Sequence, residues 1–352
     1  MAADPTPTDR VLPSSSKTVS TYALDDHRLL TAARRGDEVA FAEMIEPLRR
    51  ALLVHCYRML GSLEDAEDAF QETLVRAWRH LGAYEPNGPL RNWVYRIATN
   101  VCLNTLARRR TPVRGEGATA YAGLEPLPDH LIDDGDEDPA AIAERRESVD
   151  LAFMAAVQIL PPRQRAVLLL RDVLDWSARE VAAALETTPA AVNSALARAR
   201  GTLAHERAGS RLTRTHQPLP TSQEQTLARR FAAAWHRADL DGLIEMLTAD
   251  ALLTMPPQPL RVEGAEAIAT FLRDVASGGR LERFRLVPTR ANRQPALALY
   301  RDDTDRGDRH VAYTVLVLAL AGGRIASLVR FGGGDAFRAF GLPATLSSPL
   351  AV

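Results

Sequence analysis

Cysteine is scarce in this chain of 352 residues. Cys56 and Cys102 are its two cysteines, and both lie in apolar stretches that the residue pattern predicts to be helical. Two cysteines at this separation are too few for a zinc cluster and too far apart in sequence for the disulfide framework of a small secreted domain. We therefore expect two free thiols in a hydrophobic core.

Long apolar runs and a large net charge are missing as well. No stretch reaches the roughly 18 continuous apolar residues that span a bilayer, and the N-terminal segment has no apolar signal region. The formal net charge is -1 and 46% of residues are hydrophobic, as in an ordinary folded protein, and Lys17 is the only lysine. The sequence thus predicts a cytoplasmic protein with no membrane partner, and net charge alone gives no sign of nucleic acid.

The length predicts two to three domains, each with its own core. A second scarcity marks a boundary, because no Lys or Arg occurs between Arg114 and Arg145 while acidic residues are frequent there. This stretch is typical of an acidic linker that does not fold. The expected organisation is a disordered tail (1–22), a helical block (23–110), the acidic linker (111–140), a second helical block (141–208), a linker (209–222), a mixed block (223–342) and a tail (343–352).

The clearest helix lies between Ser62 and Arg79, where apolar residues recur at steps of three and four. Ser62 and Asp65 have the spacing of a capping box at its start. Its opposite face is acidic and polar, and is predicted to face solvent: Glu64, Glu67, Asp68, Gln71 and Glu72.

A pair of short helices in the second block has the pattern of a helix-turn-helix. Ser177 and Glu180 form a capping box, and Thr188 caps a second helix with Pro189 at its first position. In DNA-binding versions this second helix enters the major groove. The alternative is an ordinary helical hairpin with solvated arginines. The residues predicted to project outward are Asn193, Ser194, Ala197 and Arg198, with Arg200 within reach of the backbone.

The order of these blocks resembles a known family. The stretch RRGDEVAFAEMIEPLRRALLVHCYRMLGSLEDAEDAFQETLVRAWRHLGAY, with the later LRNWVYRIATN, resembles region 2 of extracytoplasmic-function (ECF) sigma factors, and LPPRQRAVLLLRDVLDWSAREVAAALETTPAAVNSALARARGTL resembles their region 4. The resemblance implies two all-α domains that bind core RNA polymerase through its β′ and β subunits and direct it to promoter DNA. It implies no catalytic residue, cofactor or metal, and leaves open whether an anti-sigma factor exists.

The resemblance also implies roles for particular residues. Asp68, Gln71 and Glu72 would bind the coiled coil of the β′ subunit. Aromatic and basic residues of the next segment would melt and capture the minus-ten element by stacking and charge. Trp93 could equally be a core residue, and the loop from Glu85 to Leu90 is the stronger candidate for base capture. The minus-ten set is Asn87, Arg91, Trp93, Tyr95, Arg96 and Asn100.

The implied minus-thirty-five set comes from region 4. It comprises Arg179, Pro189, Asn193, Ser194, Ala197, Arg198 and Arg200. The sequence departs from the family pattern because Asn193 and Ala195 replace two usual arginines, which predicts weaker phosphate contact and a shallower salt dependence. In sigma factors the joining linker threads near the polymerase active-site channel, so its negative charge here is read either as a nucleic-acid mimic or as a solvated tether.

The third block resembles the SnoaL-like branch of the NTF2-like fold, an α+β cone-shaped sheet around a pocket. Thr221 and Glu224 are predicted to cap its first helix, and Gly322-Gly323 to join two strands as a hairpin. Its expected role is a ligand sensor or an intramolecular regulatory surface. Polar residues on or near its strands are Asp250, Glu263, His310, Tyr313 and Arg330; none has a diagnostic catalytic spacing, and Tyr313 and Arg330 are the pocket candidates.

Two other functions are compatible with parts of the sequence. One is a SnoaL-like isomerase or cyclase fused to a DNA-binding module, and the other is a ligand-responsive regulator that binds DNA alone. Neither needs the acidic face around Asp68 or the segment around Trp93, so region 2 favours the sigma factor.

Overall fold

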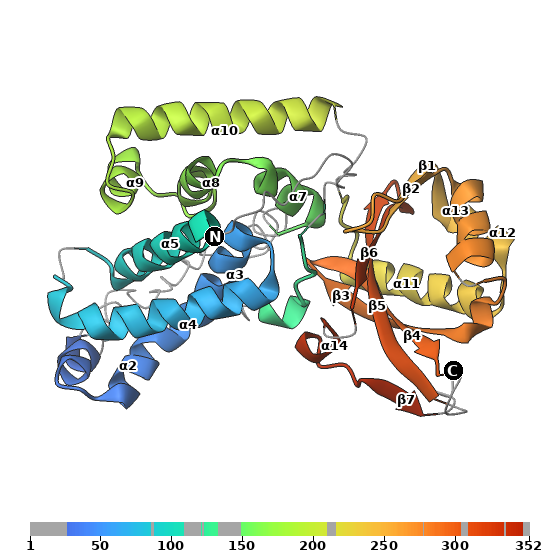
Figure 1. Ribbon diagram of the computed structural model, residues 1–352, viewed down its shortest axis with the longest axis horizontal. Coiled ribbons are helices and arrows are strands. Elements are labelled where there is room, and N and C mark those ends of the chain that lie inside the picture. The colour runs from blue at the N-terminus through green and yellow to red at the C-terminus, as the bar shows by residue number, and fades with distance from the viewer. Residues whose placement is uncertain are drawn as a thin grey trace, which may run out of the picture.

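The computed structural model describes residues 27–85, 88–108, 121, 123–132, 149–209, 216–276, 278–303, 309–333 and 336–347. An all-helical half lies beside a curved sheet with its own helices (Figure 1). The predicted fold class, two all-α domains followed by an α+β domain, is confirmed.

The first helical domain is built on the helix predicted from Ser62. The Ser62 hydroxyl accepts a hydrogen bond from the Asp65 N–H at 3.2 Å, and the helix buries Ala66, Ala69 and Phe70 along one face. Its helices are α2 (Glu38–Ile45), α3 (Arg49–Leu60), α4 (Leu63–His80) and α5 (Leu90–Arg108).

The second helical domain contains the predicted helix-turn-helix. Ser177 and Glu180 make both bonds of a capping box, and the Ala191 N–H donates to the Thr188 hydroxyl at 3.2 Å. The domain consists of α7 (Leu151–Ile159), α8 (Pro162–Leu168), a π-helical turn (Leu169–Val173), α9 (Ala178–Ala184) and α10 (Pro189–Gly209).

The C-terminal domain wraps helices around one face of a seven-stranded sheet in the order β2-β1-β6-β5-β4-β3, with β7 paired to β5. Gly322 and Gly323 join β5 and β6 with φ of 57° and 76°, which confirms the predicted hairpin. Its elements are α11 (Thr221–His236), α12 (Leu240–Met246), β1 (Leu247–Thr254), β2 (Arg261–Glu263), α13 (Ala265–Phe271), β3 (Phe284–Ala291), β4 (Gln294–Asp302), β5 (Arg309–Ala321), β6 (Arg324–Gly332), α14 (Ala336–Ala339) and β7 (Thr345–Ser347).

The start of α11 differs from the prediction. Pro220 precedes the helix, Thr221 lies in its first turn, and no side-chain hydrogen bond caps it. Glu224 is buried instead, because its carboxylate accepts hydrogen bonds from the segment before the helix and from a strand. The S/T-x-x-E spacing therefore identified the helix correctly but assigned Glu224 the wrong partners.

The sheet contributes to two hydrophobic cores. Its concave face packs on α11, α12 and α13 through Leu297, Leu316 and Leu318. The opposite face, with Ala298, Val315 and Val329, belongs to the same continuous core as α3, α7 and α8. Burial of apolar surface therefore joins the C-terminal domain to both helical domains.

The cysteines are free and buried, as predicted. A hydrogen bond with Cys56 and burial raise the pKa of the Cys102 thiol well above its ordinary value, so this thiol is unreactive near neutral pH. Within the ranges that the structure describes, no helix is long and apolar enough to cross a membrane.

Candidate polymerase and promoter interfaces

The acidic face of α4 is open. Asp68, Gln71 and Glu72 are all exposed, as predicted, together with Glu67 on the same face. Glu72 makes a surface ion pair with Arg76 one turn later at 2.7 Å. The face also exposes Val75, at 42% of its full accessible area, beside the charges. The α4 face is therefore acidic and accessible, with one exposed apolar side chain among its charges.

The segment predicted to melt the promoter forms α5, and its residues differ in exposure. Arg91 and Arg96 are exposed, while Trp93 and Asn100 are half-buried. The Trp93 ring lies 5.2 Å from that of Tyr84, so part of it packs as a core residue. Asn87 lies outside the described residues.

The helix-turn-helix packs directly against α5. Asn92 Nδ2 donates to Glu180 Oε1 at 3.1 Å, and Arg96 lies 3.9 Å from the Glu186 carboxylate. Between these contacts the Tyr95 ring is buried, with its centroid 6.5 Å from that of Trp176. Tyr95, predicted to contact the minus-ten element, therefore faces region 4 and not solvent in this conformation, because its apolar ring fills the contact between the two helical domains.

The second helix of the motif, α10, presents its predicted face to solvent. Asn193, Ser194, Ala197 and Arg198 are exposed, as are Pro189 and Arg179. Arg200 is exposed too, but its guanidinium makes two hydrogen bonds to the Asp172 carboxylate at 3.0 and 2.7 Å. This bidentate pair holds Arg200 against the turn after α8, so Arg198 is the exposed arginine in the middle of the recognition face.

The described part of the acidic linker is docked on region 2. Glu125 Oε2 accepts hydrogen bonds from the Leu63 N–H at 2.6 Å and the Ser62 hydroxyl at 3.1 Å, which places a carboxylate at the N-terminus of α4. The Glu125 N–H donates to the Gly61 carbonyl at 2.9 Å. Gly61 has φ of 80°, and a Cβ on it would lie 2.9 Å from Leu124. The prediction of a segment without structure did not anticipate this docking.

The turn between β3 and β4 connects all three domains. Asn292, fully buried, accepts a hydrogen bond from the Leu127 N–H at 2.9 Å through Oδ1. Its Nδ2 donates to the Tyr57 hydroxyl of α3 at 3.0 Å and to the Val149 carbonyl before α7 at 2.8 Å. Two residues later, Gln294 Oε1 accepts the N–H of Leu151 at 2.8 Å. One turn of the C-terminal domain thus holds region 2, the linker and the start of region 4.

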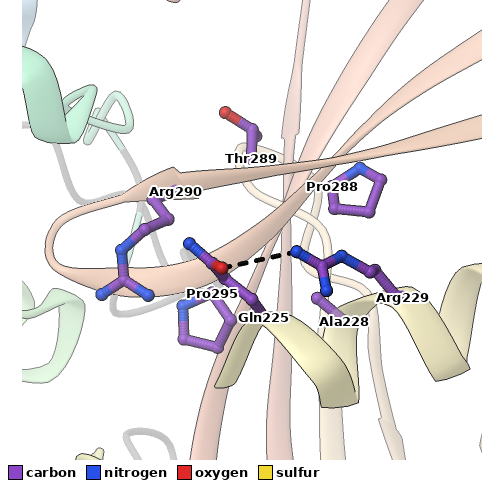
Figure 2. Close-up of a pocket in the computed structure, with 7 residues that line it drawn as sticks. All are labelled: Gln225, Ala228, Arg229, Pro288, Thr289, Arg290 and Pro295. Carbon is purple, nitrogen blue, oxygen red and sulfur yellow. Dashed lines mark hydrogen bonds between the residues drawn. The ribbon is translucent and has the colours of Figure 1, made fainter. Parts of the chain in front are cut away.

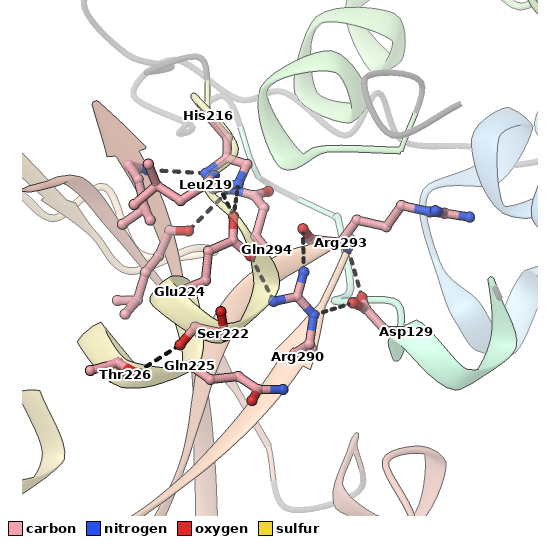
Figure 3. A network of polar contacts seen from close by, with 12 residues as sticks. Asp129, His216, Leu219, Ser222, Glu224, Gln225, Thr226, Arg290, Arg293 and Gln294 are labelled. Carbon is pink, nitrogen blue, oxygen red and sulfur yellow. Dashed lines mark hydrogen bonds and ion pairs between the residues drawn. The ribbon is translucent and has the colours of Figure 1, made fainter. Parts of the chain in front are cut away.

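Charged residues reinforce this turn (Figure 3). Arg290 donates to the Asp129 carboxylate of the linker at 2.8 Å and to the Glu224 carboxylate of α11 at 2.7 Å. Asp129 also accepts the Arg293 N–H at 2.7 Å. His216, in the second linker, lies 3.1 Å from Glu224 through Nε2, and its Nδ1 accepts the Leu320 N–H at 3.1 Å. The acidic linker contacts Arg290 through Asp129, and the second linker contacts the Arg290 partner Glu224 through His216.

The concave side of the sheet holds a small pocket. Tyr313 and Arg330, the predicted pocket residues, line it together with apolar side chains, among them Trp235, Phe271 and Leu316. Asp250 and Glu263 are exposed and His310 is half-buried, and these three do not line it. A separate open groove of about 590 Å³ lies between α11 and the β3–β4 hairpin, with Arg229 and Arg290 in its wall (Figure 2).

Sequence reasoning missed the residues that hold the domains together. Asn292, Glu125 and Asp129 lie in segments without a recognisable motif, and their partners are 61 to 235 residues away. The one available signal was the dipeptide Asn292-Arg293 between two apolar runs, since Asn tolerates the left-handed backbone of a tight hairpin.

Comparison with known proteins agrees with this architecture. Residues 44–111 match Sigma-70 region 2, residues 150–203 match Sigma-70 region 4, and residues 228–328 match the SnoaL-like domain. The chain is 43% identical over 344 residues, 93% of this chain and 90% of the relative, to the ECF RNA polymerase sigma factor SigG of Mycobacterium tuberculosis. It is 27% identical over 179 residues, 48% of this chain and 90% of the relative, to SigW of Bacillus subtilis.

Among solved structures, the ECF sigma factor SigJ of Mycobacterium tuberculosis superimposes with a TM-score of 0.59, 22% identity, and coverage of 86% of this chain and 99% of that one. This likeness establishes the fold. The fold and the three matched regions define a two-domain sigma factor with an added SnoaL-like domain. The chain belongs to the ECF RNA polymerase sigma factors, and it acts as a sigma factor that binds core RNA polymerase and directs transcription initiation.

Proposed function

We propose that the α4 face formed by Asp68, Gln71 and Glu72 binds the β′ subunit, that α5 and the loop before it open the minus-ten element, and that α10 reads the minus-thirty-five element. The exposure of the α4 and α10 faces supports these roles. In this proposal Arg198 and Asn193 carry direct base contacts, since Arg suits guanine and Asn suits adenine. Arg179 and Arg200 serve the phosphate backbone.

We further infer that the conformation described here is closed and does not bind a promoter. At about 3.4 Å per base pair, elements ten and thirty-five base pairs upstream are about 85 Å apart. Here α5 and the helix-turn-helix are in hydrogen-bonding contact through Asn92 and Glu180. The two domains must separate to reach both elements. This contact between the promoter-opening helix and region 4 is the observation that carries the proposal.

The C-terminal domain is the restraint that keeps the closed state together. Asn292 holds Tyr57 of region 2 and Val149 at the start of region 4. The α4 face stays exposed in the same conformation, so polymerase can bind first and then draw the linker away from the turn. This order makes the C-terminal domain an intramolecular regulator of promoter binding.

The geometry of the pocket favours binding over turnover. Its titratable lining residues are Tyr313 and Arg330, and the described lining contains no carboxylate or imidazole. Isomerases and cyclases of this fold use such groups as general acids and bases. We propose that the chain has no enzymatic activity and acts in the cytoplasm, where its polymerase partner is.

Promoter-directed transcription with purified core polymerase tests the assigned docking face. The variant D68R/E72R is expected to lose polymerase binding and transcript together. D241R/E245R is the matched control, because Asp241 and Glu245 are exposed acidic residues with the same spacing on α12. Normal transcription by D68R/E72R, or equal loss in the control, would contradict the assignment.

Hydrogen–deuterium exchange tests the closed state. The Leu127 and Leu151 amides donate to side chains of the β3–β4 turn, so they should be protected in the free chain. On addition of core polymerase, exchange in peptides covering 124–131 and 149–154 is expected to increase. A transcribing complex in which both peptides stay fully protected would overturn the closed-state proposal.

A further inference from the structure

The concave pocket of the C-terminal domain has an apolar interior and a cationic mouth. Its walls are formed by aromatic and aliphatic side chains of α11, α13 and the sheet, including Trp235, Phe284 and Leu299, and its volume is about 60 Å³. Tyr313 and Arg330 are its polar lining residues. Water bound there would have few polar partners, so the interior is suited to an apolar group.

Arg330, the charged residue of the pocket lining, belongs to a row of side chains across three neighbouring strands. Tyr313 of β5 lies between Arg330 of β6 and Arg301 of β4, and each guanidinium carbon is 4.8 Å from the centre of the Tyr313 ring. The two positive charges therefore lie within twice that distance of each other. Phe284 of β3 extends the row, with its ring centre 5.6 Å from that of Tyr313.

Neither arginine has an anionic partner within the described part of the chain. Two other arginines near this sheet differ in this respect: Arg283, just before β3, pairs with Asp302 at 3.0 Å, and Arg290 of β3 pairs with two carboxylates. The face of the Tyr313 ring attracts each cation, but it does not neutralise the charge. Two neighbouring guanidiniums at the rim of an apolar pocket form a site that an anion would complete.

We propose that this pocket binds a small carboxylate, with its apolar part inside the cone, its carboxylate on Arg330, and the nearby positive charge of Arg301 adding to the attraction. The volume sets the size of the apolar part. One water-sized group needs about 10–15 Å³ of such volume, so the pocket holds about four or five carbon atoms. The class is a short aliphatic carboxylic acid. In this proposal larger acids, of the size that usual ligand pockets of about 300 Å³ or more accept, bind more weakly than the short acid.

This site is independent of the interdomain restraint proposed above, because binding is measured on the free full-length chain without polymerase. The probe is isovalerate, titrated by isothermal calorimetry at fixed ionic strength. The expected Kd is about 0.1–1 mM for a ligand of this size. Isovaleramide, which has the same shape without the charge, and acetate, which lacks the apolar body, are both expected to bind at least about tenfold more weakly.

The variants locate the site. R330Q is expected to weaken isovalerate binding at least about tenfold. R330K keeps the charge and should weaken binding less. The effect of R301Q should lie between those of R330K and R330Q. Arg324, an exposed arginine at the start of β6, supplies the matched control R324Q, which should bind as the unmodified chain does. Thermal unfolding of each variant shows whether the domain is still folded.

Three results would overturn the proposal. One is no heat of binding with isovalerate up to 10-fold above the expected Kd. Another is equal affinity for isovaleramide, which would mean that the arginines do not recognise charge. The third is equal weakening by R330Q and R324Q, which would place any binding elsewhere on the surface.

Discussion

The two tight hairpins of the C-terminal sheet have the same geometry and opposite surroundings. Asn292-Arg293 and Gly322-Gly323 each form a two-residue turn with positive φ at both positions, 55° and 59° in the first and 57° and 76° in the second. Gly322 and Gly323 are exposed, and a Cβ on either would meet nothing within 4 Å. Asn292 is fully buried against two other domains.

The difference shows how a turn can serve its own hairpin or the whole chain. A glycine pair accepts the left-handed backbone without steric cost and adds no side-chain contact; the contact that this turn makes is the hydrogen bond from the Gly322 N–H to Gln217 Oε1 at 2.9 Å. Asn292 and Arg293 accept it at some cost, and the hydrogen bonds of the Asn292 side chain offset that cost. The β5–β6 turn thus stabilises the sheet and the segment before α11, while the β3–β4 turn stabilises the arrangement of the domains.

The largest expected effect comes from making the first turn like the second. N292G keeps the backbone geometry but leaves the Leu127 N–H, the Tyr57 hydroxyl and the Val149 carbonyl without their partner. Unsatisfied buried groups cost about 1–3 kcal/mol each, so the closed state should lose about 3 kcal/mol or more. Exchange of the Leu127 and Leu151 amides should accelerate about 100-fold.

The same variant tests the regulatory role. If the turn restrains promoter binding, N292G should give more transcript than the unmodified chain at limiting core polymerase, with unchanged affinity of its α4 face for polymerase. If exchange accelerates but the amount of transcript stays the same, the turn restrains the domains without regulating transcription, and the regulatory role is refuted.

Much of this architecture was predictable because it rests on local rules. The N-cap at Ser62, the capping box at Ser177, Pro189 at the start of α10 and the Gly322-Gly323 turn are short-range patterns with one common structural outcome each. Asn292 has no such pattern, since its value depends on Tyr57, which is 235 residues away in sequence. The burial of Tyr95 could not be predicted for the same reason: region 4, distant in sequence, covers it.

Arg290 is expected to have the next largest effect. R290M removes the cation between Asp129 and Glu224, whose side chains are 13% and 2% exposed. Because the Arg290 side chain is itself 21% exposed, the closed state should lose about 2 kcal/mol of stability at pH 7. This is less than the loss expected for a fully buried ion pair. Hydrogen–deuterium exchange of the Leu127 amide measures this loss of stability.

The pH dependence of stability gives a second test of the R290M prediction. Burial pushes the pKa of the Glu224 carboxyl upward, but hydrogen bonds from His216 and Arg290 outweigh burial and hold the pKa below its ordinary value of 4.5. A depressed pKa contributes stability above pH 4.5 that is lost as the pH falls through the folded value. The difference between the unmodified chain and R290M should therefore shrink on acidification below pH 4.5. A constant difference would contradict the ion pair.

Tyr57 should show a smaller effect. Y57F removes the hydroxyl that accepts from Asn292 at 3.0 Å and donates to the Glu125 carbonyl at 2.7 Å, but keeps the buried ring. The closed state should weaken by about 1–2 kcal/mol. In the double variant with N292G the two effects should not add, because both remove one shared hydrogen bond. Fully additive effects on Leu127 exchange would show that the two residues act independently.

The smallest effect is expected when the second turn is made like the first. G322N places asparagine at φ of 57°, which asparagine tolerates, and its side chain would extend into open space. Without a partner domain there, stability should change by no more than about 0.5 kcal/mol, and exchange at Leu127 and transcript yield should stay the same. Thermal unfolding measures the stability, and the exchange and transcription assays used for N292G measure the other two. If G322N altered the linker amides as strongly as N292G does, the restraint would arise from the stability of the sheet as a whole, and the contrast between the two turns would carry no meaning for regulation.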